Sequence, residues 1–284
     1  MLACIFTQTI LPKEKFLTFK LIFYYIYWSI RLGIPPWYYF QINAEWYNKE
    51  KGFYSKIDID GHIPKKWRLQ QAYLDKSNLP SDFPVFFKPE WGQNSNGVVR
   101  IDNAQDFMGF ESSSKIPYIV QYAAHERNEY EVFFIRDAKH KNQLSTLNIA
   151  QSINRSNERY PINCIHNKAV TYRDVTSDFN AQELEVLHRY LRELPDFRIA
   201  RVGLRADSKA DLLAGDFHII EINLFAPFPI HLLDNTISKK SKHQFIKTNM
   251  KHLVKVSKTI PKTAFNRFVF SKKIIKHYQS KAGE

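Results

Sequence analysis

A strand-like apolar run near residue 220 ends in a carboxylate and an amide that could hold a metal ion. Glu221 and Asn223 are two residues apart after the apolar residues of 217–220, so both side chains leave the same face of an extended strand. Carboxylate and amide oxygens are hard ligands that suit Mg²⁺ held jointly with phosphate oxygens. We therefore predict Glu221 and Asn223 as metal ligands. The alternative is a structural pair with another partner, since unpaired polar groups are costly to bury.

A lysine at the end of an earlier apolar strand could contact a phosphate. Residues 84–89 read Pro-Val-Phe-Phe-Lys-Pro, and a polar loop with glycines at both ends leads to another strand at 98–101. This order predicts a hairpin. The loop glycines, Gly92 and Gly97, let backbone N–H groups turn toward an anion, and Lys88 would add a point charge. The alternative is a plain structural hairpin, because the phosphate-binding motif GxxxxGK[ST] is missing.

Charged residues also follow the strand period further along the chain. Residues 118–122 form one expected strand and residues 129–136 another, in which Glu129 and Glu131 share one face. These two acids either face solvent or line a site, where they would accept hydrogen bonds from sugar hydroxyls or bind a metal. Arg201 lies in a further strand-like stretch, before the candidate metal ligands.

The composition is that of a globular protein from a reducing compartment. Hydrophobic residues make up 44% and charged residues 24% of the 284 residues, which excludes a disordered chain, a collagen and a coiled coil. Cys4 and Cys164 are too few for a disulfide framework, and no Cys/His spacing indicates zinc. A secretory signal, a dinucleotide-binding GxGxxG motif and a nucleophile elbow are not evident. We therefore expect a cytoplasmic protein.

Three parts of the chain must position these residues. Residues 1–61 form an aromatic-rich N-terminal segment, residues 62–237 a central domain, and residues 238–284 a basic C-terminal segment. The central domain alternates strand-like and helix-like pieces, which predicts an α+β or α/β fold.

The two terminal segments could meet a membrane surface. Residues 16–30 are apolar, but Lys20 leaves an uncharged run far below the ~20 residues of a membrane span. This helix either packs on the protein or touches a bilayer. The chain has a net charge of +13, and residues 238–284 hold twelve Lys and one Arg but only one Glu. We expect this segment to form two amphipathic helices separated by Pro261.

A basic segment suits an acidic partner or a solvated helix face. The partner hypothesis is an anionic membrane, contacted peripherally at its inner face through residues 16–40 and 238–284, rather than nucleic acid; a solvated helix face is the alternative. Stable anchoring commonly takes two weak signals, and these two stretches could supply them.

In their order along the chain, these pieces resemble the ATP-grasp superfamily, which includes D-alanine–D-alanine ligase and other carboxylate–amine ligases. The resemblance rests on Lys88-Pro89, the loop 92–97, Val120-Gln121-Tyr122, the Glu129 strand, Arg201 and Glu221-x-Asn223. The chain looks most like a ligase-like group that lacks the usual N-terminal domain, a likeness that includes Asn43, Ser55-Lys56, Asp211-Leu212 and His231. It implies an α+β ATP-grasp fold, in which two α+β subdomains hold ATP between them.

The resemblance also implies roles for individual residues. The nucleotide-binding residues would be Lys88 at the phosphates, Gly92, Ser95 and Gly97 in the loop over them, Gln121 and Tyr122 at the adenine, and Glu129 at the ribose. Arg201 would be the catalytic residue that steadies the γ-phosphate or an acyl phosphate, and Glu221 and Asn223 would ligate Mg²⁺. The implied activity is an ATP- and Mg²⁺-dependent ligase that activates a small carboxylate as an acyl phosphate for attack by an amine. His231 would line the acceptor side or be structural.

The sequence departs from the family pattern in three ways. Gly203 stands where the family has an Asp that binds metal, and Asp207 is too far along an extended strand to replace it. The loop carries Asn94-Ser95-Asn96 where glycine is usual, and no second lysine or Gly-Asp-Gly turn is found after residue 150. Two further hypotheses therefore stay open: a degenerate, non-catalytic ATP-binding protein, and a basic-tail module that binds nucleic acid or membrane.

Overall fold

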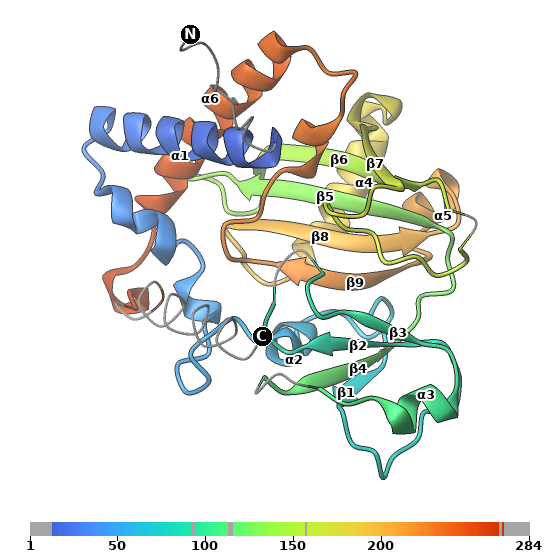
Figure 1. Cartoon of the computed structure of the whole chain (residues 1–284). Helices are drawn as coiled ribbons and strands as arrows, with labels where there is room; N and C mark the ends of the chain where they lie inside the picture. Colours follow the sequence, from blue (N-terminus) through green and yellow to red (C-terminus); the bar gives the residue numbers. More distant parts are fainter. Residues whose placement is uncertain (1–12, 93–94, 113–115, 157, 267–268, 270–284) are drawn as a thin grey trace, which may run out of the picture.

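Two sheets, each with antiparallel strand pairing, form the body of the protein (Figure 1). The computed structural model describes residues 13–92, 95–112, 116–156, 158–266 and 269. The large sheet has the order β7-β6-β5-β8-β9 and the small sheet the order β1-β4-β2-β3. The α+β prediction is confirmed.

Most expected strands and the first expected helix are found. The strands are β1 (Gln71–Tyr73), β2 (Val85–Pro89), β3 (Val99–Ile101), β4 (Tyr118–Tyr122), β5 (Asn128–Arg136), β6 (Leu144–Asn154), β7 (Val170–Asp174), β8 (Ile199–Ala206) and β9 (Phe217–Asn223). The helices are α1 (Lys13–Arg31), α2 (Lys56–Asp60), α3 (Ala104–Gly109), α4 (Ala181–Arg192), α5 (Lys209–Ala214) and α6 (Lys239–Ser257), with short 3₁₀ helices η1 (Pro36–Gln41), η2 (Ala44–Trp46), η3 (Thr176–Asp178), η4 (Ile230–Leu233) and η5 (Lys262–Ala264). The predicted hairpin is the β2–β3 pair, in which Val85 lies opposite Ile101.

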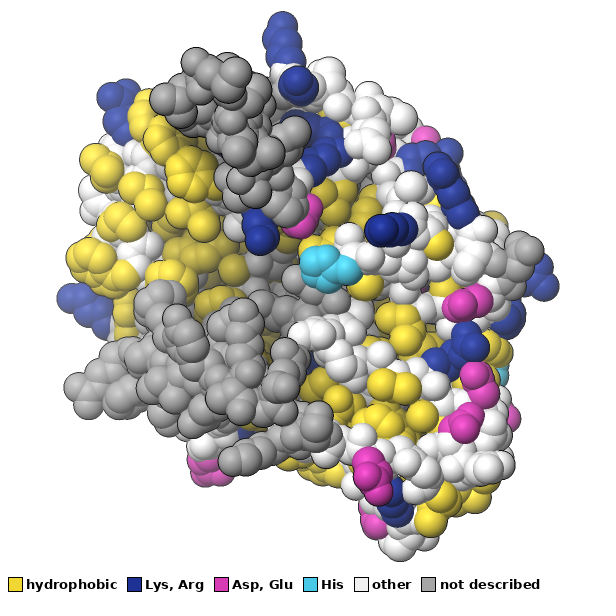
Figure 2. All heavy atoms as spheres, in the orientation of Figure 1, with side chains coloured by type: hydrophobic (Ala, Val, Ile, Leu, Met, Phe, Trp, Pro, Cys, Tyr) yellow, Lys and Arg dark blue, Asp and Glu magenta, His cyan; other side chains and the backbone are white. Residues whose placement is uncertain are grey.

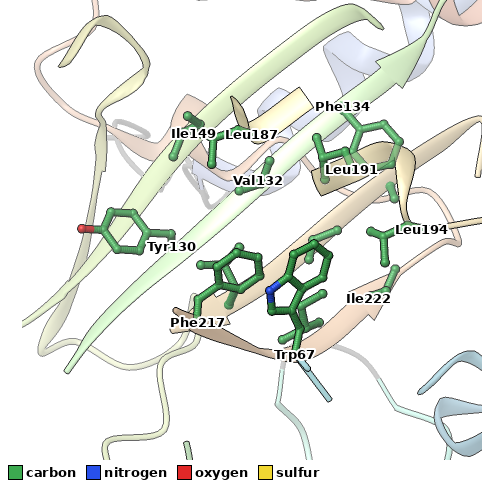
Figure 3. Close-up of a cluster of buried hydrophobic side chains, with 14 of the residues drawn as sticks. Trp67, Tyr130, Val132, Phe134, Ile149, Leu187, Leu191, Leu194, Phe217 and Ile222 are labelled. Atoms are coloured by element: carbon green, nitrogen blue, oxygen red, sulfur yellow. The ribbon is translucent and has the colours of Figure 1, made fainter. Parts of the chain in front are cut away.

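One face of the large sheet carries the main hydrophobic core (Figure 3). The even-numbered residues of β5, such as Val132 and Phe134, point into it and pack with residues of α4 and α5. Trp67 is buried there and stacks on Phe217, with 4.7 Å between the ring centroids. A capping box at Asn180 fixes the start of α4. This core holds the backbone of β5, β8 and β9 in register.

The opposite face of the large sheet is apolar at one end of the strands and charged farther along them. Its end near α1 and α6 is apolar, where Phe133, Ile135 and Ile199 join a second core with Leu21 and Ile246. Farther along the strands, the same face carries charged side chains of β5, β8 and β9. The small sheet lies on the β9 side of the large sheet (Figure 1). The same strands therefore supply both a packed core and a polar surface.

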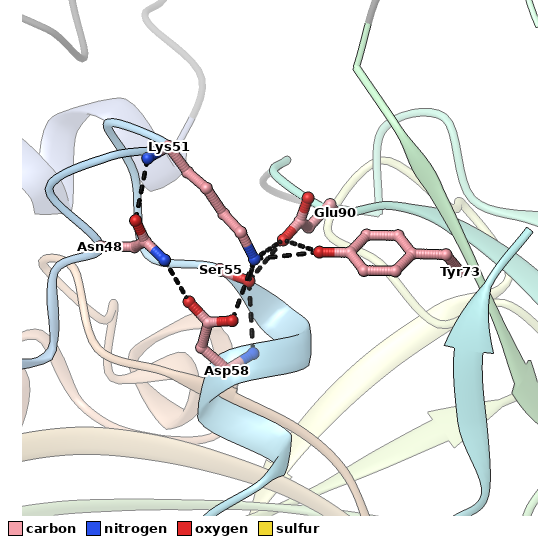
Figure 4. Close-up of polar contacts among 6 residues, drawn as sticks. All are labelled: Asn48, Lys51, Ser55, Asp58, Tyr73 and Glu90. Carbon is pink, nitrogen blue, oxygen red and sulfur yellow. Dashed lines mark hydrogen bonds and ion pairs between the residues drawn. The ribbon is translucent and has the colours of Figure 1, made fainter.

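A polar network around the buried Glu90 joins the N-terminal segment to the small sheet (Figure 4). Lys51 Nζ lies 2.7 Å from Glu90 Oε1 and 2.9 Å from Asp58 Oδ1. Ser55 and Tyr73 donate to the same Glu90 oxygen. Glu90 follows β2 directly and is almost fully buried. The boundary between the N-terminal segment and the central domain at residue 61 stays a prediction, and Lys51 and Ser55 contact Glu90 across it.

Helix α6 ends before Pro261, as the sequence predicts. The second basic helix expected after Pro261 lies largely outside the described residues, which stop at 266 apart from 269. Within the described ranges, every helix is too short or too polar to span a membrane.

Candidate functional site

A cleft between the two sheets gathers most of the residues that the sequence analysis selected. Its walls combine residues of the small sheet with residues of the large one; they include Lys88, Gly92, Ser95, Gln121, Tyr122, Glu129, Glu221 and Asn223. Residues from two sheets meet here because the polar end of the large sheet faces β2 and β4. Lys56 of α2 also lines the cleft, although we assigned it no role from the sequence.

Lys88 reaches into the cleft from the end of β2. Its Nζ donates to Gln121 Oε1 at 2.6 Å and to the Ile220 carbonyl at 3.4 Å. Both acceptors are neutral, so the ammonium keeps its positive charge available for an anion. Burial lowers the pKa of Lys88, and the nearby Glu221 and Glu129 oppose that shift.

Glu129 lies at one end of the charged row and is only 6% exposed. Its Oε2 accepts from Asn163 Nδ2 at 2.9 Å and lies 4.0 Å from Arg205 Nε. Arg205 is its cross-strand partner on β8. Burial raises the pKa of Glu129, while Arg205 and the Asn163 hydrogen bond lower it. The alternative that Glu129 and Glu131 face solvent is excluded, since Glu131 is 7% exposed.

Arg201 lies between two carboxylates. Its Nε is 3.0 Å from Glu131 Oε2 and its Nη2 is 3.6 Å from Glu221 Oε1; it also donates to the Phe228 carbonyl. Arg201 does not line the cleft itself and reaches it only through Glu221. Burial would raise the pKa of Glu221, but Arg201, Lys88 and other cations outweigh it and leave the pKa below its usual value.

Gly203 leaves room for an acid from the neighbouring strand. It lies opposite Glu131 on one side and Glu221 on the other. A Cβ added at Gly203 would lie 3.3 Å from Glu221 Cγ and 3.6 Å from Glu131 Oε2. A side chain at position 203 would therefore project toward the space that the Glu131 carboxylate occupies. Among the described atoms, Glu131 Oε2 has no hydrogen-bond partner of good geometry.

Glu221 and Asn223 form the expected pair on one face of β9. Asn223 Nδ2 donates to Glu221 Oε1 at 2.7 Å, so each side chain has a polar neighbour without a bound ion. In the part of the chain that the structure describes, no three His, Cys, Asp or Glu residues cluster as a metal site. The pair still fits Mg²⁺, because that ion is commonly bound by one or two carboxylates together with substrate phosphates and water.

The loop after β2 lies over the cleft. Ser95 has a positive φ of 56° and donates to the Asn163 carbonyl at 3.4 Å, across the opening. Gly97 has φ of 75°, and a Cβ there would meet Pro89 Cγ at 2.9 Å, so only glycine fits this turn. Gly97 lies beside the cleft rather than in its wall. The loop tip, residues 93–94, is outside the described ranges.

His231 is a structural residue in this fold. It is buried in η4 and packs edge-on against Phe245, with 4.2 Å between ring centroids. Burial lowers the pKa of His231 to about 4. It does not line the cleft, which agrees with the structural alternative.

Protonation of His231 should make the protein sensitive to acid. The folded-state pKa is below the ordinary value of 6.5, so between these values the unfolded chain binds more protons and stability falls as pH falls. From about pH 7 to about pH 5 this group should cost about 2 kcal/mol. Urea unfolding of wild type and His231→Leu at both pH values checks this. An equal loss of stability in both proteins would contradict it.

Four cleft or near-cleft residues were not found as site residues from the sequence. Glu131 was considered only together with Glu129, and Arg205 follows Arg201 by four residues, hence on the same strand face. Asn163 lies in the long loop after β6, where no motif matched, and Lys56 comes from the N-terminal segment. Strand periodicity marked Glu131 together with Glu129 and could also have selected Arg205, but no local pattern assigns a role to Asn163 or Lys56.

Comparison with known proteins finds likeness in structure only. No family model and no curated protein matches the sequence. N5-carboxyaminoimidazole synthetase from Staphylococcus aureus matches with a TM-score of 0.47 and 13% identity, over 73% of this chain and 52% of that one. D-alanine–D-alanine ligase from Bacillus anthracis matches with a TM-score of 0.45 and 14% identity, over 78% of this chain and 69% of that one. The ATP-grasp ligase PsnB, complexed with a precursor variant, Mg and ADP, matches with a TM-score of 0.43 and 11% identity. The match covers 69% of this chain and 58% of that one.

These matched structures are a synthetase, a D-alanine–D-alanine ligase and an ATP-grasp ligase, and ATP-grasp is the superfamily that the sequence motifs resemble. The chain spans about half of the synthetase. At this identity and TM-score, any activity has to be argued from the residues of the cleft.

Proposed function

We propose that the protein is an ATP-grasp ligase that uses ATP and Mg²⁺ to join a carboxylate to an amine. The observation that carries this proposal is the meeting of Lys88, Gln121, Glu129, Glu221 and Asn223, from two sheets, in one cleft. A nucleotide needs cations for its phosphates, acceptors for its ribose hydroxyls and hard oxygens for its metal ion. All three kinds of group line this cleft.

Each side chain then has a defined task. Lys88 and Lys56 neutralise phosphate charge, and Glu129, fixed by Arg205 and Asn163, accepts from the ribose hydroxyls. Gln121 and Tyr122 contact the adenine from β4. When bound, Mg²⁺ would be held by Glu221 and Asn223 and would neutralise charge on the phosphates.

The proposed reaction has two steps. A carboxylate oxygen attacks the γ-phosphorus, and the bond to the β-phosphate oxygen breaks to release ADP and form an acyl phosphate. The amine then attacks the acyl carbon and loses a proton, and inorganic phosphate leaves as the amide forms. Positive charge from Arg201 and Lys88 stabilises both steps electrostatically, and the loop containing Ser95 keeps water from the site.

A second candidate function is ATP binding without turnover. Gly203 cannot ligate a metal, and Arg201 is engaged by Glu131 at 3.0 Å. In the ligase proposal, Glu131 supplies the acid that Gly203 lacks. In the binding-protein alternative, Glu131 only neutralises Arg201.

Calorimetry of Mg·ATP binding, followed by a phosphate-release screen with carboxylate and amine pairs, tests the proposal. We expect micromolar binding that Glu221→Ala weakens, and phosphate release that depends on both substrates. Binding without phosphate release would favour the non-catalytic candidate. A folded wild-type protein that does not bind Mg·ATP would overturn both.

ATP affinity should fall at alkaline pH because of Lys56. Its Nζ donates to the Pro89 carbonyl at 2.7 Å, and burial lowers its pKa to about 8. Below this value Lys56 carries a charge that attracts phosphate; above it, affinity should fall by up to about tenfold per pH unit. The Lys56→Arg variant stays charged and should lose affinity less steeply in calorimetry from about pH 7 to about pH 9. Parallel curves for the two proteins would contradict this role.

A further inference from the structure

Helix α1 is apolar on both of its faces, and the residues that the structure describes cover only one of them. Its inner face, Leu17, Leu21, Tyr25 and Ser29, is buried against the protein. Its outer face carries seven large side chains with substantial exposure: Phe16, Phe19, Ile22, Phe23, Ile26, Tyr27 and Ile30. Phe19 is 67% exposed and Ile30 is 71% exposed. Scattered apolar residues are ordinary on a surface, but a continuous row of this kind marks an interaction site.

The apolar surface continues beyond the helix. Leu32, directly after α1, and Trp37 in η1 are also exposed, Trp37 by 64%. Figure 2 shows hydrophobic side chains gathered on the left of the view, where Figure 1 places α1, with Lys and Arg side chains at the margin. Trp and Tyr at the edge of an apolar surface are typical of groups that lie at a membrane–water interface.

The charge around this face has one sign. Helices α1 and α6 lie side by side and together contain ten Lys and Arg residues, of which only Lys242 is buried, and a single acid, Glu14. Lys20 Nζ lies 4.6 Å from the centre of the Phe16 ring and Lys251 Nζ 4.7 Å from that of Trp28. In this arrangement the alkyl stems follow the apolar surface while the ammonium groups can reach lipid headgroups. A soluble apolar partner would not need this ring of cations.

We propose that the outer face of α1 docks the protein on an anionic membrane surface, with the cations of α1 and α6 in contact with the headgroups. Burial of the exposed aromatic and aliphatic side chains supplies one source of affinity, and the attraction of each nearby cation to anionic headgroups supplies another. Two such weak contributions together give stable association. At 19 residues and 1.5 Å per residue, α1 would lie along the surface for about 28 Å.

Vesicle flotation of the full chain tests this inference. We expect binding to phosphatidylcholine vesicles that contain phosphatidylglycerol, little binding to phosphatidylcholine alone, and weaker binding at high salt. The double variant Phe19→Ser/Ile30→Ser should lower vesicle affinity by at least about tenfold. Lys240→Glu/Lys247→Glu should lower it for charged vesicles. The matched control is Leu79→Ser/Met108→Ser, which removes two side chains that are each 52% exposed elsewhere.

Four results would overturn the proposal. Wild type could fail to float with anionic vesicles at low salt, or Phe19→Ser/Ile30→Ser could bind as well as wild type. Sedimentation could also reveal a dimer that this variant dissociates, which would assign the face to a second copy of the chain. A fluorophore on Phe19→Cys, in a Cys4→Ser/Cys164→Ser background, would show a buried emission spectrum without vesicles if a terminal segment covered the face.

The variants also separate this inference from the proposed enzyme activity. Helix α1 contributes nothing to the cleft walls, so Mg·ATP binding by Phe19→Ser/Ile30→Ser should match that of wild type. Loss of vesicle binding with retained ATP binding supports membrane docking, whatever the chemistry of the cleft.

Discussion

Replacing Lys88 with Met should weaken Mg·ATP binding by about 10- to 100-fold, the range expected when a charged hydrogen bond is lost. Met keeps the length and apolar stem of the side chain but removes its charge. Lys88 is favourably placed because Gln121 and the Ile220 carbonyl hold its Nζ without neutralising it. Calorimetry with Mg·ATP measures the effect, and circular dichroism confirms that the variant is folded.

The matched control is Lys168→Met, since Lys168 is exposed and outside the cleft. Its affinity should equal that of wild type. If Lys88→Met binds Mg·ATP as tightly as wild type does, the phosphates do not contact Lys88 and the proposed orientation of the nucleotide is wrong. If both variants lose affinity equally, the effect reports overall charge.

The strands could be predicted because their patterns are local. An apolar run with a period of two selects β2, β4, β5 and β9 wherever their partners lie. Alternation also put Glu221 and Asn223 on one face correctly, since that needs no knowledge of the neighbouring strands.

Burial and pairing could not be predicted in the same way. Glu129 and Glu131 are buried, and β8 brings Arg205 and Arg201 beside them, while Asn163 from the loop after β6 contacts Glu129. Those pairings depend on register between strands about 70 residues apart, which no local pattern contains. Lys56 enters the cleft because α2 packs beside β9, a tertiary contact between distant segments.

The acid that pairs with Arg201 can be moved from position 131 on β5 to position 203 on β8, and this exchange should decide what Glu131 does. Glu131→Ala should weaken Mg·ATP binding and lower phosphate release by about 10- to 100-fold, as losses around metal sites commonly do. Gly203→Asp alone should destabilise the protein, because its Cβ would lie 3.3 Å from both Glu221 Cγ and Ile220 Cγ1 and its carboxylate would join two others.

In Glu131→Ala/Gly203→Asp the new carboxylate would project toward the space that Glu131 leaves. We expect this double variant to recover most of the lost affinity and its dependence on Mg²⁺. Glu131→Ala/Gly203→Asn is the matched control, since it has the same shape without the charge and should not recover. Equal recovery by Asp and Asn would mean that the position needs volume rather than a metal-binding acid. Failure of both folded variants to recover would favour the non-catalytic candidate, in which Glu131 serves only to neutralise Arg201.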